Sequence, residues 1–92
     1  MFIASGKGHI GIVRELLARG ANANAAYRTG ATPLIMASWK GHVDVVRALL
    51  AAGANKRHVA NNGKTAASVA GAAAGVTPAA KAAVLALLAA AP

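Results

Sequence analysis

One glycine-rich stretch of the sequence has the spacing of a nucleotide-binding turn. Residues 6–11, Gly-Lys-Gly-His-Ile-Gly, fit the pattern G-x-G-x-x-G, in which glycines let the backbone approach a pyrophosphate. That chemistry requires a preceding strand and an acidic residue about 20 positions further on. Only five residues precede Gly6, and no acidic residue lies near the required position. We therefore interpret residues 6–11 as a turn between two helices and expect no nucleotide cofactor.

Side chains suited to acid–base, nucleophilic or metal chemistry are few. There are three histidines, two acids and no cysteine. His9 and His42 each follow Lys-Gly, so they belong to separate copies of one motif, whereas a metal site requires ligands that converge on one point. The acids, Glu15 and Asp44, lie at different positions of the two copies, and no serine has the partners of an activated nucleophile. We predict no catalytic residue, no metal site and no cofactor.

The sequence repeats itself at an interval of 33 residues. A shift of this size places Lys7-Gly8-His9 over Lys40-Gly41-His42. The match continues in Val13 with Val46, Arg14 with Arg47, Leu16 with Leu49, Leu17 with Leu50 and Gly20 with Gly53. A fixed period of this length is the signature of a stacked array, in which each unit buries its apolar face against its neighbours.

Within one unit the sequence predicts two helices joined by a glycine turn. Thr32 is a good N-cap, and Pro33 suits the first helical position, where its missing N–H is not needed. This first helix runs to about Lys40, and Gly41 ends it. The second helix has one apolar stripe, formed by Val45, Val46, Leu49 and Leu50, and Gly53 ends it.

Residues 30–55, Gly-Ala-Thr-Pro-Leu-Ile-Met-Ala-Ser-Trp-Lys-Gly-His-Val-Asp-Val-Val-Arg-Ala-Leu-Leu-Ala-Ala-Gly-Ala-Asn, strongly resemble an ankyrin repeat. The resemblance covers one domain, residues 1–92: a partial repeat at 1–25, a full repeat at 26–58, and a divergent terminal repeat at 59–92. It implies an all-α fold, an ankyrin-repeat solenoid of stacked helix-turn-helix units with hairpin-like arms. Arms and first helices would form a concave binding surface.

Two departures from the family pattern affect the second and third repeats. Ile35 replaces the family's histidine, so the hydrogen bonds of that histidine around Thr32 are lost, and we expect a weaker repeat. In the third repeat the second helix is expected five or six residues late, after Gly-Val-Thr-Pro at 75–78. Such drift is typical of a terminal repeat, which packs on one side only.

The first repeat lacks an arm, because Met1 falls on the position of Leu34. The chain therefore opens with the apolar residues Phe2, Ile3 and Ile10, whereas terminal repeats normally present a polar outer face. We expect something to cover these residues, and our leading hypothesis is that further repeats precede Met1.

Composition limits both the core and the partners. Hydrophobic residues make up 57% of the chain, but 27 residues are alanine, so the core must be thin. Ten lysines and arginines against two acids give a net charge of +8, which favours acidic proteins, nucleic acid or anionic lipid as partners. The sequence has no secretory signal and no stretch of about 20 strongly apolar residues, so we expect an intracellular chain without a membrane span.

The resemblance also selects candidate binding residues. The family's binding positions fall on Lys7, Tyr27, Arg28, Thr29, Trp39, Lys40, Asn61, Asn62 and Lys64. Trp, Tyr and Arg dominate interface energies when they are desolvated. The alternative interpretation is that Trp39 only shields the stack and that the lysines are simply solvated. Residues 56–58, Lys-Arg-His, would extend the basic strip.

From these features we predict a non-catalytic protein–protein interaction module that binds an acidic partner surface through a basic concave face. The alternative is that the same face binds nucleic acid or an anionic surface, since phosphate contacts come mainly from lysine and arginine.

Overall fold

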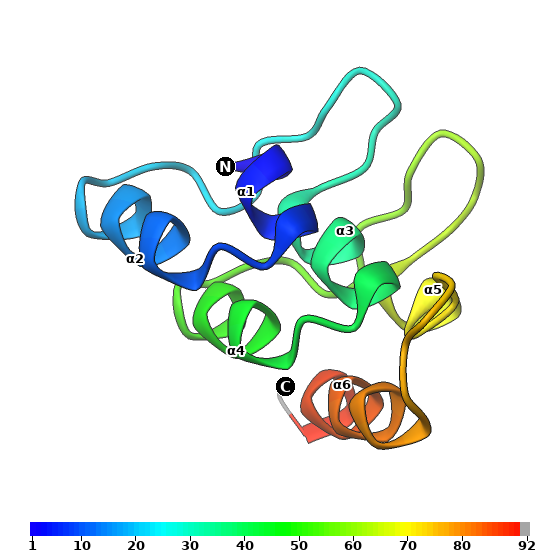
Figure 1. The fold of residues 1–92 in the computed structure, drawn as a ribbon. Helices are drawn as coiled ribbons and strands as arrows, with labels where there is room; N and C mark the ends of the chain where they lie inside the picture. Colours follow the sequence, from blue (N-terminus) through cyan, green and yellow to red (C-terminus); the bar gives the residue numbers. More distant parts are fainter. Residues whose placement is uncertain (91–92) are drawn as a thin grey trace.

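The computed structural model describes residues 1–90, which form three pairs of helices and no strand (Figure 1). The helices are α1 (Phe2–Lys7), α2 (Ile10–Ala18), α3 (Pro33–Lys40), α4 (Val43–Ala51), α5 (Ala66–Val69) and α6 (Pro78–Ala90). Two long arms, residues 19–32 and 52–65, connect successive pairs. The predicted all-α stack of helix-turn-helix units is thereby confirmed. None of these helices combines the length and the apolar character needed to cross a bilayer.

The ends of α3 follow from the residues that flank it. The Thr32 hydroxyl accepts a hydrogen bond from the Ile35 N–H at 3.3 Å, and Pro33 occupies the first turn. At the other end Gly41 adopts a φ of 74°, a left-handed conformation that glycine adopts without steric cost. Both ends lie where the sequence predicted them.

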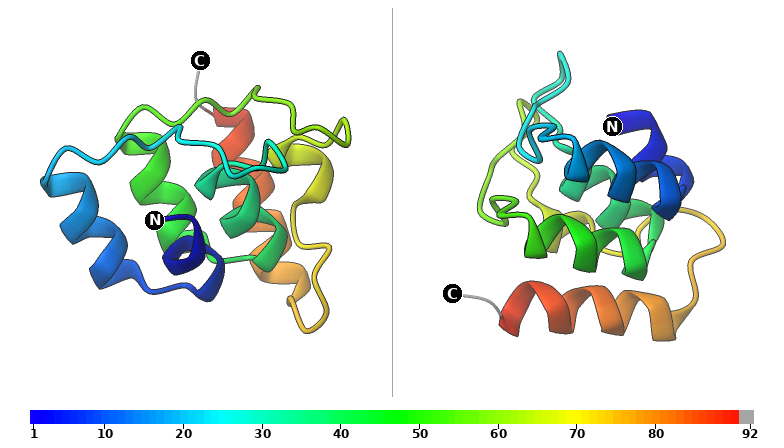
Figure 2. Two further views of the ribbon diagram at one scale, coloured as in Figure 1. Left: turned by 90° about the horizontal axis from the view of Figure 1, so that it is seen from above. Right: turned by 90° about the vertical axis from the view of Figure 1, so that its left-hand side faces the viewer.

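The helices form two layers (Figures 1 and 2). The inner layer contains α1, α3 and α5, with α3 packed between the other two. The outer layer contains α2, α4 and α6, with α4 in the middle. The second helix pair therefore has neighbours on both sides, whereas the first and third pairs each have a neighbour on one side only.

Burial follows this order of stacking. In α4 the stripe residues Val45, Val46 and Leu49 are completely buried, as the apolar spacing predicted. In α2 only Val13 is buried, and Leu16 and Leu17 are half-buried. The difference arises because α2 has no helix on its far side.

The third helix pair departs from the 33-residue period less than expected. Helix α6 begins at Pro78, two residues after the position that the period assigns, so the expected delay of five or six residues was wrong. The added residues fall in the connection from α5, which is tied to the end of α3. The Gly71 N–H donates to the Ser38 carbonyl at 2.9 Å, and the Ala73 N–H donates to the Trp39 carbonyl at 3.1 Å. The expected last helix, 79–91, extends one residue past the described part.

Two buried serine hydroxyls are unsatisfied. Ser5 and Ser38 hold equivalent positions of α1 and α3, and neither Oγ has a hydrogen-bond partner within residues 1–90. A buried polar group without a partner lowers stability. We expect Ser38→Ala to raise the free energy of unfolding by up to about 1 kcal/mol, measured by urea denaturation.

Ser68→Ala is the matched control with the opposite sign. The Ser68 Oγ accepts from the Thr65 N–H at 2.8 Å, and the Ser68 N–H donates to Thr65 Oγ1 at 3.2 Å, so this serine completes the N-terminal cap of α5. Its loss should lower stability by about 1 kcal/mol. A loss of stability in Ser38→Ala would mean that its hydroxyl has a partner.

Candidate binding surface

The tips of the two arms are tight turns that lie side by side (Figure 2). In the first arm the Tyr27 N–H donates to the Ala31 carbonyl at 2.8 Å, and in the second the Ala60 N–H donates to the Lys64 carbonyl at 2.9 Å. The Asn61 N–H donates to the Thr29 carbonyl at 3.0 Å and joins the tips. The arms therefore project as one connected unit beside the inner helices.

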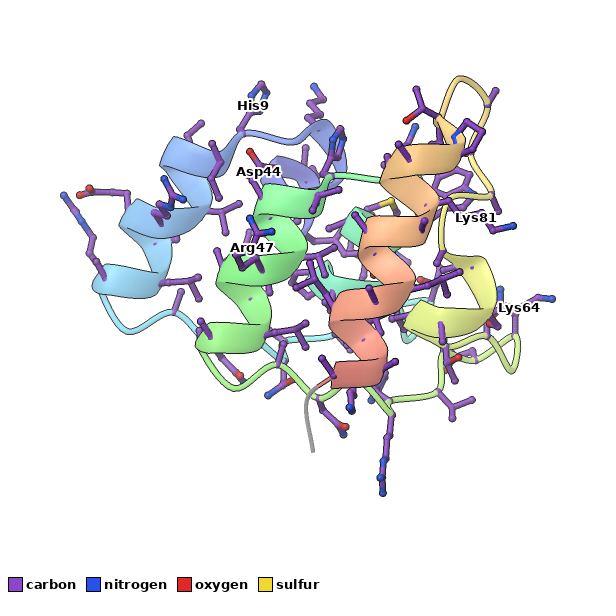
Figure 3. The ribbon with its side chains drawn as sticks, turned by 90° about the horizontal axis from the view of Figure 1, so that it is seen from below. His9, Asp44, Arg47, Lys64 and Lys81 are labelled. Atoms are coloured by element: carbon purple, nitrogen blue, oxygen red, sulfur yellow. The ribbon has the colours of Figure 1, made fainter. Side chains whose placement is uncertain are left out.

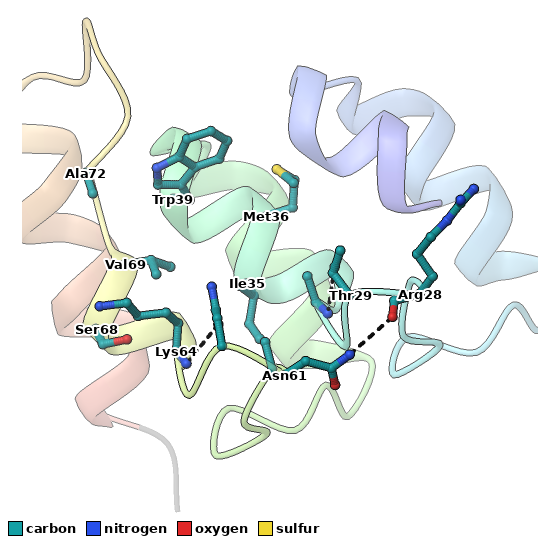
Figure 4. A pocket seen from close by; sticks show the side chains of 13 residues that line it. Arg28, Thr29, Ile35, Met36, Trp39, Asn61, Lys64, Ser68, Val69 and Ala72 are labelled. Carbon is teal, nitrogen blue, oxygen red and sulfur yellow. Dashed lines mark hydrogen bonds between the residues drawn. The ribbon is translucent and has the colours of Figure 1, made fainter.

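Between the arm tips and the helices α3 and α5 lies a groove of about 850 Å³ (Figure 4). Its floor is apolar and consists of Ile35, Met36, Trp39 and Val69. Its rim is polar and consists of Thr29, Asn61, Asn62, Lys64 and Ser68. A concave apolar surface of this size with a few polar groups is typical of a ligand site. We refer to these residues as the groove.

Five of the nine predicted binding residues have their side chains in the groove. They are Thr29, Trp39, Asn61, Asn62 and Lys64. Arg28 lines the groove through its backbone, because its carbonyl accepts from Asn61 Nδ2 at 3.2 Å while its side chain extends away from Trp39 (Figure 4). The Arg28 guanidinium lies 5.2 Å from the centroid of the Tyr27 ring.

Tyr27 lies outside the groove, at the α1 end of the stack. Its ring stacks on Phe2, with the centroids 4.8 Å apart and the planes 11° apart, and 43% of its surface stays exposed. The first arm thus covers part of the apolar start of the chain. Ile3 and Ile12 remain 66% and 53% exposed.

Lys7 and Lys40 lie at the opposite ends of the inner helices from the arms. Both line a shallower hollow of about 530 Å³, together with His42, Val76 and Thr77. The Lys40 ammonium is 4.8 Å from the centroid of the Trp39 ring, so the indole separates this lysine from the groove. The predicted cations therefore fall into two places: Lys64 at the groove, and Lys7 with Lys40 at the turns.

The comparison with families of known proteins bears on this arrangement. Residues 1–90 match the family described as ankyrin repeats, in three copies. The chain belongs to the ankyrin-repeat family. Ankyrin repeats are in general protein–protein interaction modules, and the family is typically non-catalytic. A comparison with curated proteins finds no match to the chain.

The groove is built from the same positions of two consecutive ankyrin repeats. Met36 and Val69 are 33 residues apart, as are Thr29 and Asn62. The remaining lining residues pair in the same way: Arg28 with Asn61, Ala31 with Lys64, Ile35 with Ser68, and Trp39 with Ala72. Sequence analysis had not identified the apolar floor. The repeat period could have identified it, because a shift of 33 from Met36 leads directly to Val69.

Two of the three residues in the expected basic extension at 56–58 are used in structural bonds. Lys56 Nζ donates to the Leu88 carbonyl at 2.8 Å, near the end of α6, where a cation is favoured by the helix dipole. His58 Nε2 lies 2.8 Å from the Gly30 carbonyl, in the preceding ankyrin repeat. Only Arg57 of this segment is exposed.

The histidines connect repeats. His42 Nε2 lies 3.0 Å from the Gly6 carbonyl, which joins the start of α4 to the first repeat, while His9 is exposed. Among the described residues no three of His, Cys, Asp and Glu lie close enough together to hold a metal ion.

Proposed function

We propose that this ankyrin-repeat chain is a non-catalytic module that binds a protein partner through the groove and the basic surface around it. The observation that carries the proposal is the position of Trp39. Its ring lies in the apolar floor, remains 37% exposed, and is surrounded by a polar rim (Figure 4). Interfaces concentrate their binding energy in such central aromatic residues, and polar groups around them exclude water.

The charge of the chain supports an acidic partner. Ten basic side chains face only two acids, and one of these, Glu15, is already paired with Arg19 at 2.9 Å on the exposed surface of α2. The positive charge is therefore largely uncompensated. It accelerates the approach of a negatively charged protein and disfavours a positively charged one.

The test begins with a displayed library of random 12-residue peptides, selected on the immobilised 92-residue chain. For the selected peptides, Trp39→Ala should weaken binding about 30-fold, corresponding to roughly 2 kcal/mol. Fluorescence anisotropy measures the affinity, and circular dichroism checks that the helices are retained. The matched control is Ile12→Ala, which truncates an exposed apolar side chain of α2 and should leave the affinity unchanged. Equal affinities for Trp39→Ala and the parent chain would remove the groove as the binding site.

Binding of nucleic acid or an anionic surface by the same face is the second candidate, and the net charge of +8 favours it. The two candidates differ in their dependence on salt. Affinity for an oligonucleotide should fall steeply as the salt concentration rises, since each phosphate contact releases a counterion. Absence of oligonucleotide binding at low salt would eliminate the second candidate.

A further inference from the structure

The polar groups of the groove show which kind of partner it fits, because several of them are already used within the protein. The Thr29 hydroxyl accepts from the Ala31 N–H at 3.4 Å, and Asn62 Oδ1 accepts from the Lys64 N–H at 3.0 Å. Ser68 Oγ is occupied by both the N–H and the carbonyl of Thr65. These groups shape the rim and have little capacity left for a ligand.

The unused capacity consists of donors. In the part of the chain that the structure describes, Lys64 Nζ, Asn62 Nδ2 and Trp39 Nε1 have no hydrogen-bond partner, and all three belong to residues that line the groove. Each of these groups donates and cannot accept. A ligand that satisfies them must supply acceptors, and the strongest pairing for the Lys64 ammonium is with an anion.

No carboxylate of the described residues lines the groove to compete for these donors. Glu15 is bound to Arg19 on α2. Asp44 is on the outer helix α4 (Figure 3), where its carboxylate accepts from the Val45 N–H at 2.9 Å. The groove therefore combines an apolar floor with an uncompensated donor rim.

We propose that the groove binds a short segment of an acidic protein in which a large apolar side chain and a carboxylate stand within a few residues of each other. The apolar side chain packs on Trp39, Met36 and Val69, and the carboxylate accepts from Lys64 and Asn62. This inference rests on the proposed function and specifies its partner. The groove volume of about 850 Å³ lies within the range of 300–1,000 Å³ that is typical of sites for small ligands, so a few residues of a partner fill it.

A nucleic-acid strand fits the same site less well. A groove that follows a phosphate backbone needs several cations along its length. Lys64 is the one basic residue whose side chain belongs to this rim in the described structure, since Arg28 lies over Tyr27 and Lys40 lies behind Trp39. The apolar floor is suited to an aliphatic or aromatic side chain of a peptide.

The test uses the peptides selected on the chain from the random library. We expect them to be enriched in Asp or Glu near a Leu, Ile, Phe or Trp. In one selected peptide, replacement of the acid by its amide should weaken binding about fivefold, the upper end for an exposed charge pair. Lys64→Glu should weaken the original peptide at least as much and should bind better the peptide in which the acid is replaced by lysine. Arg47→Glu changes the net charge equally but lies on the outer layer (Figure 3), and it should not show this reversal.

Each outcome of the experiment has a distinct meaning. Peptides that depend on Trp39 but show no enrichment in acids, or no reversal with Lys64→Glu, would overturn this inference and leave the proposed function intact. A selection that yields no Trp39-dependent peptide would overturn the proposed function itself. Tighter binding of a 12-nucleotide oligothymidine than of any peptide, with loss in both Trp39→Ala and Lys64→Glu, would assign the groove to nucleic acid.

Discussion

Leu49→Ala lowers the free energy of unfolding by about 2–5 kcal/mol, because it leaves a cavity in the best-packed part of the stack. Leu49 is completely buried in α4, which has α2 on one side and α6 on the other, so its surroundings cannot easily collapse into the space. A loss of this size is a large fraction of the stability available to so small a domain. Urea denaturation followed by circular dichroism at 222 nm measures it.

Leu16→Ala is the control for this prediction. Leu16 holds the equivalent position of α2 but is half-buried, since no further helix covers α2. Its truncation removes less buried area and should therefore cost clearly less. If Leu16→Ala and Leu49→Ala were equally destabilising, the two helices would have equal surroundings, contrary to the observed burial.

Gly30→Ala lowers the free energy of unfolding by about 2–4 kcal/mol, the second large effect that we expect. Gly30 has a φ of 80°, which is unfavourable for alanine, and an added Cβ would lie 2.8 Å from the backbone nitrogen of Asn61 and 2.6 Å from its Oδ1. The backbone of the second arm must shift to relieve this contact. Because the same arms form the groove, peptide binding should weaken as well.

Gly63→Ala separates the two causes. Gly63 is the equivalent residue of the second arm, with a φ of 79°, but a Cβ there would have no neighbour within 4 Å. This substitution should show only the backbone cost of about 1–2 kcal/mol. Equal losses at Gly30 and Gly63, measured by urea denaturation, would show that the contact between the arms is easily relieved.

The sequence was sufficient to predict the repeated helix pairs, because their signals are local. Thr32, Pro33 and Gly41 set the ends of α3, and the spacing of Val45, Val46 and Leu49 set the buried face of α4. The degree of burial was less predictable. Equivalent stripes in α2 and α4 differ in exposure because burial depends on the number of neighbouring helices, which a local pattern does not contain.

The candidate site was predicted in part for a related reason. Family positions selected Trp39 and Lys64, which the fold brings to one groove. They also selected Tyr27 and Lys40, whose side chains pack on Phe2 and on the far side of Trp39. The position of a residue on an arm or helix follows from the repeat, but the direction of a long side chain depends on the rings beside it.

Ile35 shows how an apparent defect can have a second meaning. In the sequence this residue is a departure that removes a histidine's hydrogen bonds around Thr32. In the structure the Thr32 cap is intact without that histidine, and Ile35 forms part of the groove floor. Whether the repeat is weaker stays a prediction.

The origin of the groove in matching positions of two repeats has a consequence for the evolution of binding. Each repeat contributes one wall, and its exposed wall residues are largely separate from the buried residues that hold the stack together. Mutations in one repeat can therefore alter half of a recognised motif while the other half is still bound. Ligand preference can change in half-steps, through intermediates that stay folded and retain partial affinity.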